Sequence, residues 1–474
     1  MTAWLPLLPE FIIVACLGAV LLADLLLPRD RSRRVLAGVA LAGTLLALVA
    51  VAALPDGSFG GVYAADGVAR LVKILVLAAL GLVVLSAWTW DQTWKRPMGE
   101  FWFLLLSAGL GMMVLASGQE LITLYIGLEL ATVPMVLLTA YCPADRKSAE
   151  GGLKFLILAA VGSGVLLFGL SLLYAAAGAT RLADLAQALV GRSLEPMVVI
   201  GLLCVLVGLG FKVALVPFHL WVPDAYEGAP TPVTAFLSVA SKTAGFVLAL
   251  RLLAGAFAAL SREWGMVLAV LAAATMTLGN FAAIPQTNLK RLLAYSSVAQ
   301  AGYLIMGLVA GDTLGLSALL YYLAAYLPTN LAAFAVVIAI EQASGSTDLA
   351  AYAGLAQRSP RLGLVLMLAL LSLAGIPPLA GFTAKFYLFT AVFGQGYVWL
   401  VVLAVLNSAL SLYYYLRVIR AVYIQPPERL PATGVAVAWP LALVLTATLI
   451  GILLLGVFPG LVVESARQAV QHLL

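Results

Sequence analysis

The sequence predicts an all-α protein that crosses a membrane about fourteen times. Its 474 residues are 64% hydrophobic and only 10% charged, with a mean hydropathy of +1.09, whereas soluble domains carry about 25% charged residues. The apolar residues gather in long runs, and a hydrocarbon core of about 30 Å needs about 20 apolar residues per helix. A membrane admits only helices or closed barrels, and these runs are too long for barrel strands. No strand is therefore expected.

The apolar runs divide the chain into fourteen expected spans. They cover approximately residues 9–27, 35–54, 67–88, 101–118, 121–140, 152–177, 196–222, 231–253, 264–284, 291–309, 314–340, 362–391, 396–424 and 437–457. The first run has no basic flank and no small-residue cleavage site, so it is expected to be a membrane helix rather than a cleaved signal. The seventh and twelfth runs contain internal prolines, which remove a backbone hydrogen bond and interrupt a helix.

Basic residues favour the loops that follow the odd-numbered spans. They are Arg29, Arg31, Arg33, Arg34, Lys95, Arg96, Arg146, Lys147, Lys290, Arg291, Arg358, Arg361, Arg417, Arg420 and Arg429. The positive-inside rule makes these loops cytoplasmic, although Arg181, Arg192 and Arg262 on the other side dilute the bias. Fourteen spans then place both termini on the periplasmic side. The alanine- and arginine-rich composition indicates a bacterial protein, and hence the inner membrane.

The composition also excludes several classes of function. No basic run suits nucleic acid, and the Gly-containing segments lie in apolar helices rather than after a strand, so no dinucleotide site is expected. The cysteines (Cys16, Cys142 and Cys204) are scattered, and the only histidines are His219 and His472. Neither an iron–sulfur cluster, a haem nor a zinc site is indicated. The chain itself is expected to hold no cofactor and no metal.

Five ionisable residues fall inside apolar runs, namely Glu129, Lys154, Lys212, Lys242 and Lys385. A buried, unpaired charge costs several kcal/mol, so such residues usually serve a function, and groups that gain and lose protons are what a proton path needs. Two alternatives stay open. Glu129 could be a protonated acid in a helix interface, and Lys154, close to a helix end, could extend its ammonium to the interface.

Four other charged residues lie close to helix ends, namely Glu10, Asp24, Arg70 and Lys73. Long charged side chains in such places extend toward the aqueous interface. The sequence therefore predicts that these groups are solvated and have no role in the membrane interior.

Both proline-broken spans carry a lysine within two turns of the break. Lys212 precedes Pro217, and Lys385 follows Pro377 and Pro378. Broken helices at matching places in two halves of a chain are typical of inverted-repeat transporters, which bind their ion at the break. The alternative is that prolines are simply common in membrane helices.

Polar stripes at helical spacing accompany these lysines. They are Ser296, Gln300 and Tyr303 in the tenth span, Asn407, Ser411 and Tyr414 in the thirteenth, and Ser238, Ser241 and Thr243 around Lys242. Such stripes face the bundle interior. They could line water, which would give Lys242 a hydrated pocket, or they could only hydrogen-bond between helices. A carboxylate about 5 Å from a lysine would attract it by about 3 kcal/mol, enough to alter its proton affinity.

Three motifs make the chain resemble a known family. They are FKVALVPFHLWVPDAYEGAPTPVT (211–234), LKRLLAYSSVAQAGY (289–303) and GIPPLAGFTAKF (375–386). The chain resembles the antiporter-like membrane subunits of the proton-pumping NADH:quinone oxidoreductases, or respiratory complex I. It is most similar to the N type, because the M type has glutamate where this chain has Lys385. The L type also carries a long lateral helix after the fourteenth span.

The resemblance implies two inverted five-helix repeats, formed by spans four to eight and nine to thirteen. The expected regions are an N-terminal three-helix region (1–100), a first repeat (101–253), a second repeat (254–424) and a C-terminal helix (425–474). Proton translocation would use Glu129 paired with Lys212, then Lys242 as the central relay and Lys385 in the second half-channel. Lys154 would have a lesser role, and His219 would link the half-channels.

The resemblance also implies partners. Neighbouring antiporter-like and small membrane subunits would surround the chain, and flavin, iron–sulfur clusters and quinone would belong to other subunits. Two alternatives stay open: a subunit of a multi-subunit cation/proton antiporter, and a non-transporting assembly scaffold of the membrane arm.

Overall fold

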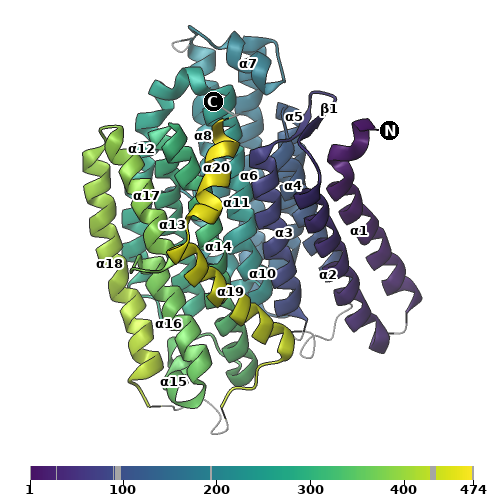
Figure 1. The fold of residues 1–474 in the computed structure, drawn as a ribbon, viewed down its shortest axis with the longest axis vertical. Coiled ribbons are helices and arrows are strands. Elements are labelled where there is room, and N and C mark those ends of the chain that lie inside the picture. The colour runs from purple at the N-terminus through teal and green to yellow at the C-terminus, as the bar shows by residue number, and fades with distance from the viewer. Residues whose placement is uncertain are drawn as a thin grey trace.

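The computed structural model describes residues 2–27, 29–88, 90, 98–192, 195–426 and 434–471. Most helices run along the long axis of a single bundle, as Figure 1 shows. Both ends of the chain lie at the end of the bundle that carries α7 (Leu182–Ala188), which we call the terminal end. The opposite end carries α15 (Leu355–Arg358), and we call it the basic end.

The first part of the chain forms six long helices and a small hairpin. Its elements are η1 (Thr2–Leu7), α1 (Leu8–Leu26), α2 (Arg29–Ala53), β1 (Gly57–Phe59), β2 (Tyr63–Ala65), α3 (Gly67–Ala87), α4 (Gly99–Ser117), α5 (Leu121–Thr139) and α6 (Arg146–Ala177), before α7. The expectation of no strand is wrong for the loop between α2 and α3. This loop lies beyond the spans, where Gly60 and Gly61 take left-handed φ angles of 61° and 71° and turn the chain back on itself.

The middle of the chain contains the first broken helix and the core of the bundle. Its elements are α8 (Pro196–Val213), α9 (Trp221–Gly228), α10 (Thr231–Phe236), η3 (Leu237–Ser241), α11 (Lys242–Ala249), η4 (Leu250–Ala256), η5 (Ala258–Leu260), α12 (Ser261–Ala283), α13 (Leu289–Ala310) and α14 (Thr313–Ser344). The elements η3 and η4 are wider π-helical turns on either side of α11. Such turns are frequent at functional sites.

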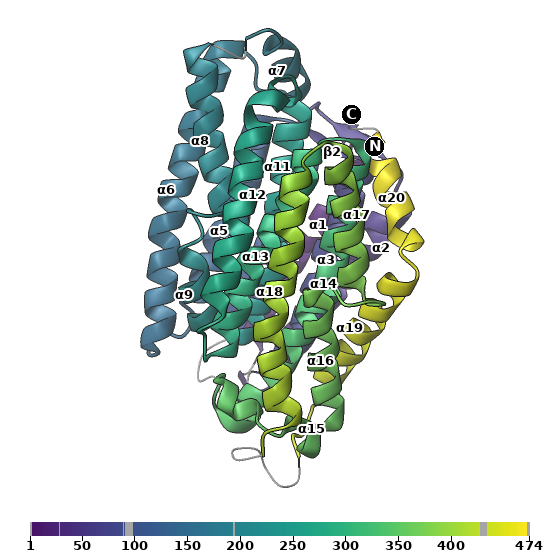
Figure 2. The same ribbon diagram turned by 90° about the vertical axis from the view of Figure 1, so that its left-hand side faces the viewer.

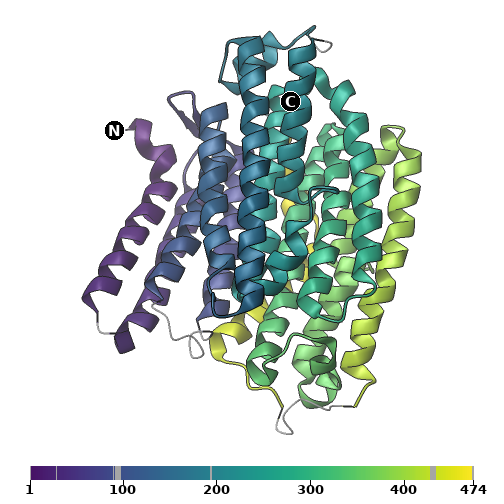
Figure 3. The ribbon, with the colours of Figure 1, turned by 180° about the vertical axis from the view of Figure 1, so that it is seen from behind.

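The last part contains the second broken helix. Its elements are η6 (Leu349–Tyr352), α15, α16 (Pro360–Ala374), α17 (Ala380–Gly394), α18 (Val398–Tyr423), α19 (Trp439–Val457) and α20 (Gly460–Gln471). Figure 2 shows α16 and α17 stacked end to end beside α18. The short helix α20 returns to the bundle and packs against α3 and α14, on the side turned away from the viewer in Figure 3.

The structure confirms the expected membrane architecture. Thirteen helical segments of the described chain are long and apolar enough to cross a membrane, and α16 with α17 supplies a fourteenth crossing in two pieces. The breaks predicted in the seventh and twelfth spans are also present. Each span is interrupted by a stretch without helix, at residues 214–220 and 375–379, because proline cannot continue the hydrogen-bond ladder.

Both ends of the chain lie at the same end of the bundle (Figure 1), as an even number of spans requires. Three of the counted charges, Lys95, Arg96 and Arg429, lie outside the described residues, as do the side chains of Arg29, Arg31 and Arg33. Which end faces the cytoplasm stays a prediction.

Small residues allow the helices to approach closely. A Cβ atom on Gly111 of α4 would collide with the backbone of Ala131 on α5, and one on Gly127 would collide with Leu115. Close backbone contact of this kind is how membrane helices gain packing energy without a hydrophobic driving force between them. The contact fixes α5, and thereby Glu129, against the bundle.

An ion pair between a buried arginine and an aspartate whose side chain is 31% exposed joins the N-terminal helices to the centre of the bundle. Arg251, in η4, has a side chain only 1% exposed and grips the Asp66 carboxylate with two hydrogen bonds of 2.6 and 2.8 Å. It also donates to the Ala116 carbonyl at 2.7 Å. Asp66 in turn caps α3 by accepting from the Ala69 amide at 2.8 Å. Removing one partner would strand a buried charge.

We therefore expect Asp66→Asn to destabilise the solubilised complex by about 3 kcal/mol, because breaking a buried pair typically costs this much. Asparagine caps a helix as well as aspartate does, so the change isolates the charge. Thermal unfolding followed by intrinsic fluorescence measures the effect.

The matched control is Asp56→Asn. Asp56 pairs with Arg70 at 2.7 Å, but both side chains are exposed (54% and 38%), and exposed pairs contribute about 0–1 kcal/mol. Equal losses in the two variants would contradict a special contribution from the Asp66–Arg251 pair.

Candidate functional site

The first helix break is held together by side chains from other helices. After α8, the chain turns at Ala214, whose φ of 65° is the only positive φ among the described non-glycine residues. The amide of Val216 donates to the Thr275 hydroxyl of α12 at 3.0 Å, and the Trp221 indole donates to the Phe211 carbonyl at 3.1 Å. The backbone groups freed by the break are thus partly satisfied by protein, as lipid requires.

Lys212 lies in the last turn of α8, next to this break. Its side chain is 5% exposed, and its ammonium donates to the Thr132 hydroxyl of α5 at 2.8 Å. A cation in the last turn of a helix is favourable, because the helix dipole is negative there.

Glu129 lies one turn before Thr132 on α5 and is partly buried. Its carboxylate accepts a hydrogen bond from Ser163 of α6. Glu129 and Lys212 form no salt bridge within 4.0 Å. Lys212 instead contacts Thr132, one turn away from Glu129 on the same helix. A pairing of the two charges at a longer distance, of about 5 Å, stays a prediction.

Lys242 begins α11, between the two π-helical segments. Its side chain is 3% exposed, and its ammonium donates to the Ser297 carbonyl of α13. The hydroxyls of Ser238 and Thr243 donate to carbonyls of their own helix at 2.8 and 2.9 Å, which leaves their oxygens able to accept. The hydrated pocket expected from Ser238, Ser241 and Thr243 stays a prediction. The observed polar surroundings of Lys242 come from α13, where the Ser297 hydroxyl lies 3.1 Å from the Tyr226 hydroxyl.

Lys385 caps the first half of the second broken helix from the other side of the break. Its side chain is 4% exposed, and its ammonium donates to the Leu373 and Ala374 carbonyls at 3.0 and 3.1 Å and to the Ser408 hydroxyl at 2.8 Å. The ammonium also lies 4.6 Å from the centre of the Tyr303 ring, which adds a cation–π attraction. Both breaks thus place a lysine at the carboxyl end of their first half-helix.

The predicted polar stripes of α13 and α18 are buried, and Asn280 of α12 connects them by hydrogen-bonding to both Tyr303 and Asn407. Gln300 donates to the Leu373 carbonyl at 3.1 Å, the same atom that binds Lys385, and accepts from Tyr322 of α14. Asn280 of α12 donates to Asn407 at 3.2 Å and accepts from Tyr414 at 2.9 Å. The interior orientation predicted for these residues is confirmed.

His219 lies in the first break, between α8 and α9, and is 5% exposed. Its Nδ1 atom has no hydrogen-bond partner within the described parts of the chain. A buried ring nitrogen without a partner is unusual, and such an atom is available to a water or a moving proton.

Lys154 is not a buried charge. Its side chain is 45% exposed and its ammonium lies 2.7 Å from both Glu150 and Asp224. The expectation that it lies in an apolar interior is wrong, because α9 brings Asp224 to the end of α6, where Lys154 meets it.

Lys154 belongs to a network of charges at the basic end. Arg291 donates to Asp224 at 2.6 Å and to Glu227 at 3.0 Å, and Glu227 also accepts from Lys147 at 2.8 Å. Burial alone would raise the pKa of both carboxyl groups. The hydrogen bonds and charges of the surrounding bases outweigh it and hold the pKa of Asp224 and of Glu227 below their ordinary values.

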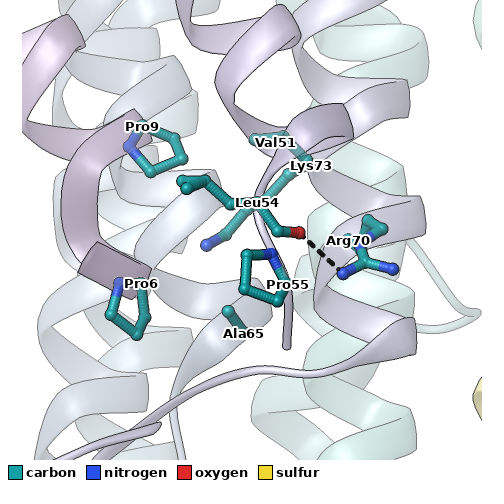
Figure 4. A pocket seen from close by; sticks show the side chains of 8 residues that line it. All are labelled: Pro6, Pro9, Val51, Leu54, Pro55, Ala65, Arg70 and Lys73. Carbon is teal, nitrogen blue, oxygen red and sulfur yellow. Dashed lines mark hydrogen bonds between the residues drawn. The ribbon is translucent and has the colours of Figure 1, made fainter. Parts of the chain in front are cut away.

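Sequence reasoning missed a second buried pair at the terminal end. Lys73 is 2% exposed, lies 2.8 Å from the Glu10 carboxylate and donates to the Tyr63 hydroxyl. The expectation that Lys73 and Glu10 extend to the interface is wrong, whereas Arg70, 38% exposed, does reach Asp56. Figure 4 shows Lys73 among prolines, beside Arg70, which donates to the Leu54 carbonyl at 2.8 Å. The sequence contained a signal for this pair, because Glu10 in the first span and Lys73 in the third carry opposite charges near the same side of the membrane.

Arg251 and Lys290 were also missed as buried charges, with side chains 1% and 3% exposed. Arg251 falls near the end of the eighth expected span, and Lys290 directly precedes the tenth. Their positions along the chain alone therefore indicated the membrane–water interface.

Comparison with known proteins agrees with this geometry. Residues 118–411, which hold both broken helices, match the family model described as NADH:quinone oxidoreductase/Mrp antiporter, transmembrane. The chain belongs to this family of membrane subunits.

Within the family, the chain groups with the N subunits of NADH-quinone oxidoreductase. It is 44% identical to subunit N of Moorella thermoacetica over 96% of both chains. It is 43% identical to that of Heliobacterium modesticaldum over 98% of this chain and 99% of the other.

Solved structures support the same grouping. A chain of respiratory complex I from Thermus thermophilus, solved with bound aureothin, is 35% identical with a TM-score of 0.83, over 97% of this chain and 99% of that one. A chain of the Mrp complex from Dietzia sp. DQ12-45-1b has a TM-score of 0.86 over 99% of this chain and 97% of that one, at 22% identity. This second likeness concerns the fold alone.

The charge network at the basic end generates a pH prediction. A carboxyl group with a lowered folded-state pKa adds stability above its ordinary pKa, and this is lost as the pH falls through the folded value. The stability difference between wild type and Glu227→Gln should therefore be constant near neutral pH and shrink below about pH 4. Thermal unfolding of the solubilised chain at a series of pH values measures it. A difference that grows on acidification would contradict the assignment.

Proposed function

We propose that this chain carries protons across the membrane along its buried lysines, as a subunit of an NADH:quinone oxidoreductase. The observation that carries the proposal is the set of three deeply buried lysines, Lys212, Lys242 and Lys385. Each has an ammonium bound to hydroxyl or carbonyl oxygens rather than to a carboxylate. A lysine without a neutralising partner in a membrane is costly unless it exchanges protons.

The polar atoms between these lysines suit a relay. Ser297 connects Lys242 to α13, and on the same helix Ser296 contacts Tyr415 at 2.5 Å. One turn further, Gln300 shares the Leu373 carbonyl with Lys385. Hydroxyl groups both donate and accept, so this band supports proton movement between the two broken helices.

Individual roles follow from this arrangement. Glu129 adjusts the proton affinity of Lys212 through its charge, Lys242 is the central carrier, and Lys385 serves the second half of the path. His219, with its unpartnered nitrogen, links the first break to the relay. Lys154 stabilises the basic end and, being exposed and paired, acts only at the edge of the path.

The redox chemistry belongs to partner subunits. Flavin, iron–sulfur clusters and quinone would be held there, and this chain would have no redox centre of its own. In the described chain, no three His, Cys, Asp or Glu residues gather closely enough to hold a metal ion. The energy of electron transfer would reach the lysines through neighbouring membrane subunits.

The proposal includes a membrane orientation and a division of the chain. The basic end faces the bacterial cytoplasm and both termini face the periplasm. Residues 101–253 and 254–424 form two inverted repeats, flanked by regions 1–100 and 425–474. The similar positions of Ala214 and Gly375, both left-handed caps of a first half-helix (φ 65° and 91°), support the repeat.

Substitution of Lys242 by methionine in the assembled complex tests the proposal. Because a positioned proton carrier speeds its step by about 100-fold or more, Lys242→Met should remove this chain's share of proton pumping. Pumping per NADH oxidised, measured in proteoliposomes, gives the result. Glu129→Gln should give a smaller loss, since the acid acts at a distance.

The control is Arg262→Met, which removes an exposed cation from the first turn of α12 and should pump normally. Normal pumping by an assembled Lys242→Met complex would favour the assembly-scaffold alternative. Sodium-dependent exchange without flavin and iron–sulfur partners would favour the antiporter alternative.

A further inference from the structure

A polar cavity of about 410 Å³ lies at the basic end, between the loops that follow α5, α9, α12 and α14. We call it the vestibule. Its walls carry the carboxylates of Asp145, Glu227, Glu341 and Asp348 and the ammonium groups of Lys147 and Lys290. Glu227 is paired with Lys147 and Arg291, so the other three carboxylates give the cavity its acidic character. Its volume holds on the order of ten waters. Acidic walls attract protons to the water inside.

Lys290 lines the vestibule although it is almost completely shielded from bulk solvent, with 3% of its side chain exposed. Its ammonium donates to the Ala229 carbonyl at 2.6 Å and has no carboxylate within 4.0 Å among the described residues. Glu341, Glu227 and Asp145 line the same cavity but do not pair with Lys290 directly. Lys290 is thus a buried cation in the wall of a polar cavity without a direct carboxylate partner, like the three lysines deeper in the membrane.

The helix α13 leads from Lys290 to the central lysine. Ser297 is seven residues, or two turns, further along the same face, a rise of about 10 Å. Its carbonyl binds Lys242 and its hydroxyl meets that of Tyr226. The buried Thr234 hydroxyl lies on the Lys290 side of this stretch, 3.4 Å from the Ala229 carbonyl that Lys290 also contacts.

We propose that the vestibule and Lys290 form a proton entrance that supplies Lys242 directly; this rests on the proposed function. A hydronium ion in the vestibule gives its proton to the neutral Lys290 amine and becomes water. The ammonium then passes one proton toward a neutral Lys242 along this stretch of α13. Bridging waters would carry it between the Thr234 hydroxyl, which donates to the Tyr226 carbonyl, the Tyr226–Ser297 hydroxyl pair and Lys242. Each carrier gains and loses one proton per cycle, so nothing is consumed.

Two substitutions of Lys290 separate proton transfer from a structural role. Arginine keeps the positive charge and the donor to Ala229 but does not release its proton in proteins. We expect Lys290→Met and Lys290→Arg in the assembled complex both to lose pumping per NADH oxidised as fully as Lys242→Met. The arginine variant should keep the wild-type unfolding temperature, and Arg262→Met again serves as the control.

The outcomes decide different points. Normal pumping by Lys290→Arg would overturn the proposal, because a purely structural charge is restored by arginine. Loss of pumping by Lys242→Met together with normal pumping by Lys290→Met would overturn the entrance but not the proposed function. Normal pumping by Lys242→Met would overturn the proposed function itself.

A native cysteine allows a test that does not depend on the stability of a Lys290 variant. Cys142 lines the vestibule, and its side chain is partly exposed. A membrane-impermeant, positively charged methanethiosulfonate should reach it from the basic end and lower pumping. In Cys142→Ser, the ratio of treated to untreated pumping should return to one. Equal inhibition of both proteins, or none in the wild type, would show that the vestibule is not the entrance.

Discussion

The structure depends on one constraint: a helix that breaks inside a membrane must find new partners for its freed backbone groups. At the second break these partners include the ammonium of Lys385, the amide of Gln300 and the hydroxyl of Ser408, all directed at the end of α16. At the first break, Thr275 and Trp221 serve the backbone. The groups that satisfy the breaks belong to the same polar band as the buried lysines, so stability and function share the same side chains.

This constraint also explains which helices are most deeply buried. Every residue in the most apolar stretch of α14, and in that of the segment from α10 to η4, is buried. In α13, 94% of the residues of this stretch are buried. These central helices carry Lys242, Ser297 and Gln300, and the surrounding helices shield them from lipid. A charge survives there because hydroxyls and carbonyls stand in for water.

Much of this arrangement was predictable from the sequence. The length of the apolar runs gave the number of crossings, the prolines gave both breaks, and helical spacing gave the buried stripes of α13 and α18. The contact between Lys212 and Thr132 was not predicted, because a threonine one turn away from Glu129 gives no signal of its own in the sequence. Burial of Lys73, Arg251 and Lys290 could not be inferred from distance to a helix end, since their shielding comes from segments far away in the chain. Glu10, Asp66 and the vestibule walls reach these cations only after folding.

The geometry around Lys385 has a consequence for how its charge is sensed. An ammonium has three N–H donors, and here three oxygens, two carbonyls and a hydroxyl, receive them. A neutral amine would have only two hydrogens for three acceptors, so the Leu373 and Ala374 carbonyls at the tip of α16 would depend more on their other donors, Gln300 and Ser408, whenever the proton departs. The protonation state of Lys385 therefore sets how many hydrogen bonds hold the end of α16 to α17. A neighbouring subunit that moves these two half-helices apart would in turn change the proton affinity of Lys385.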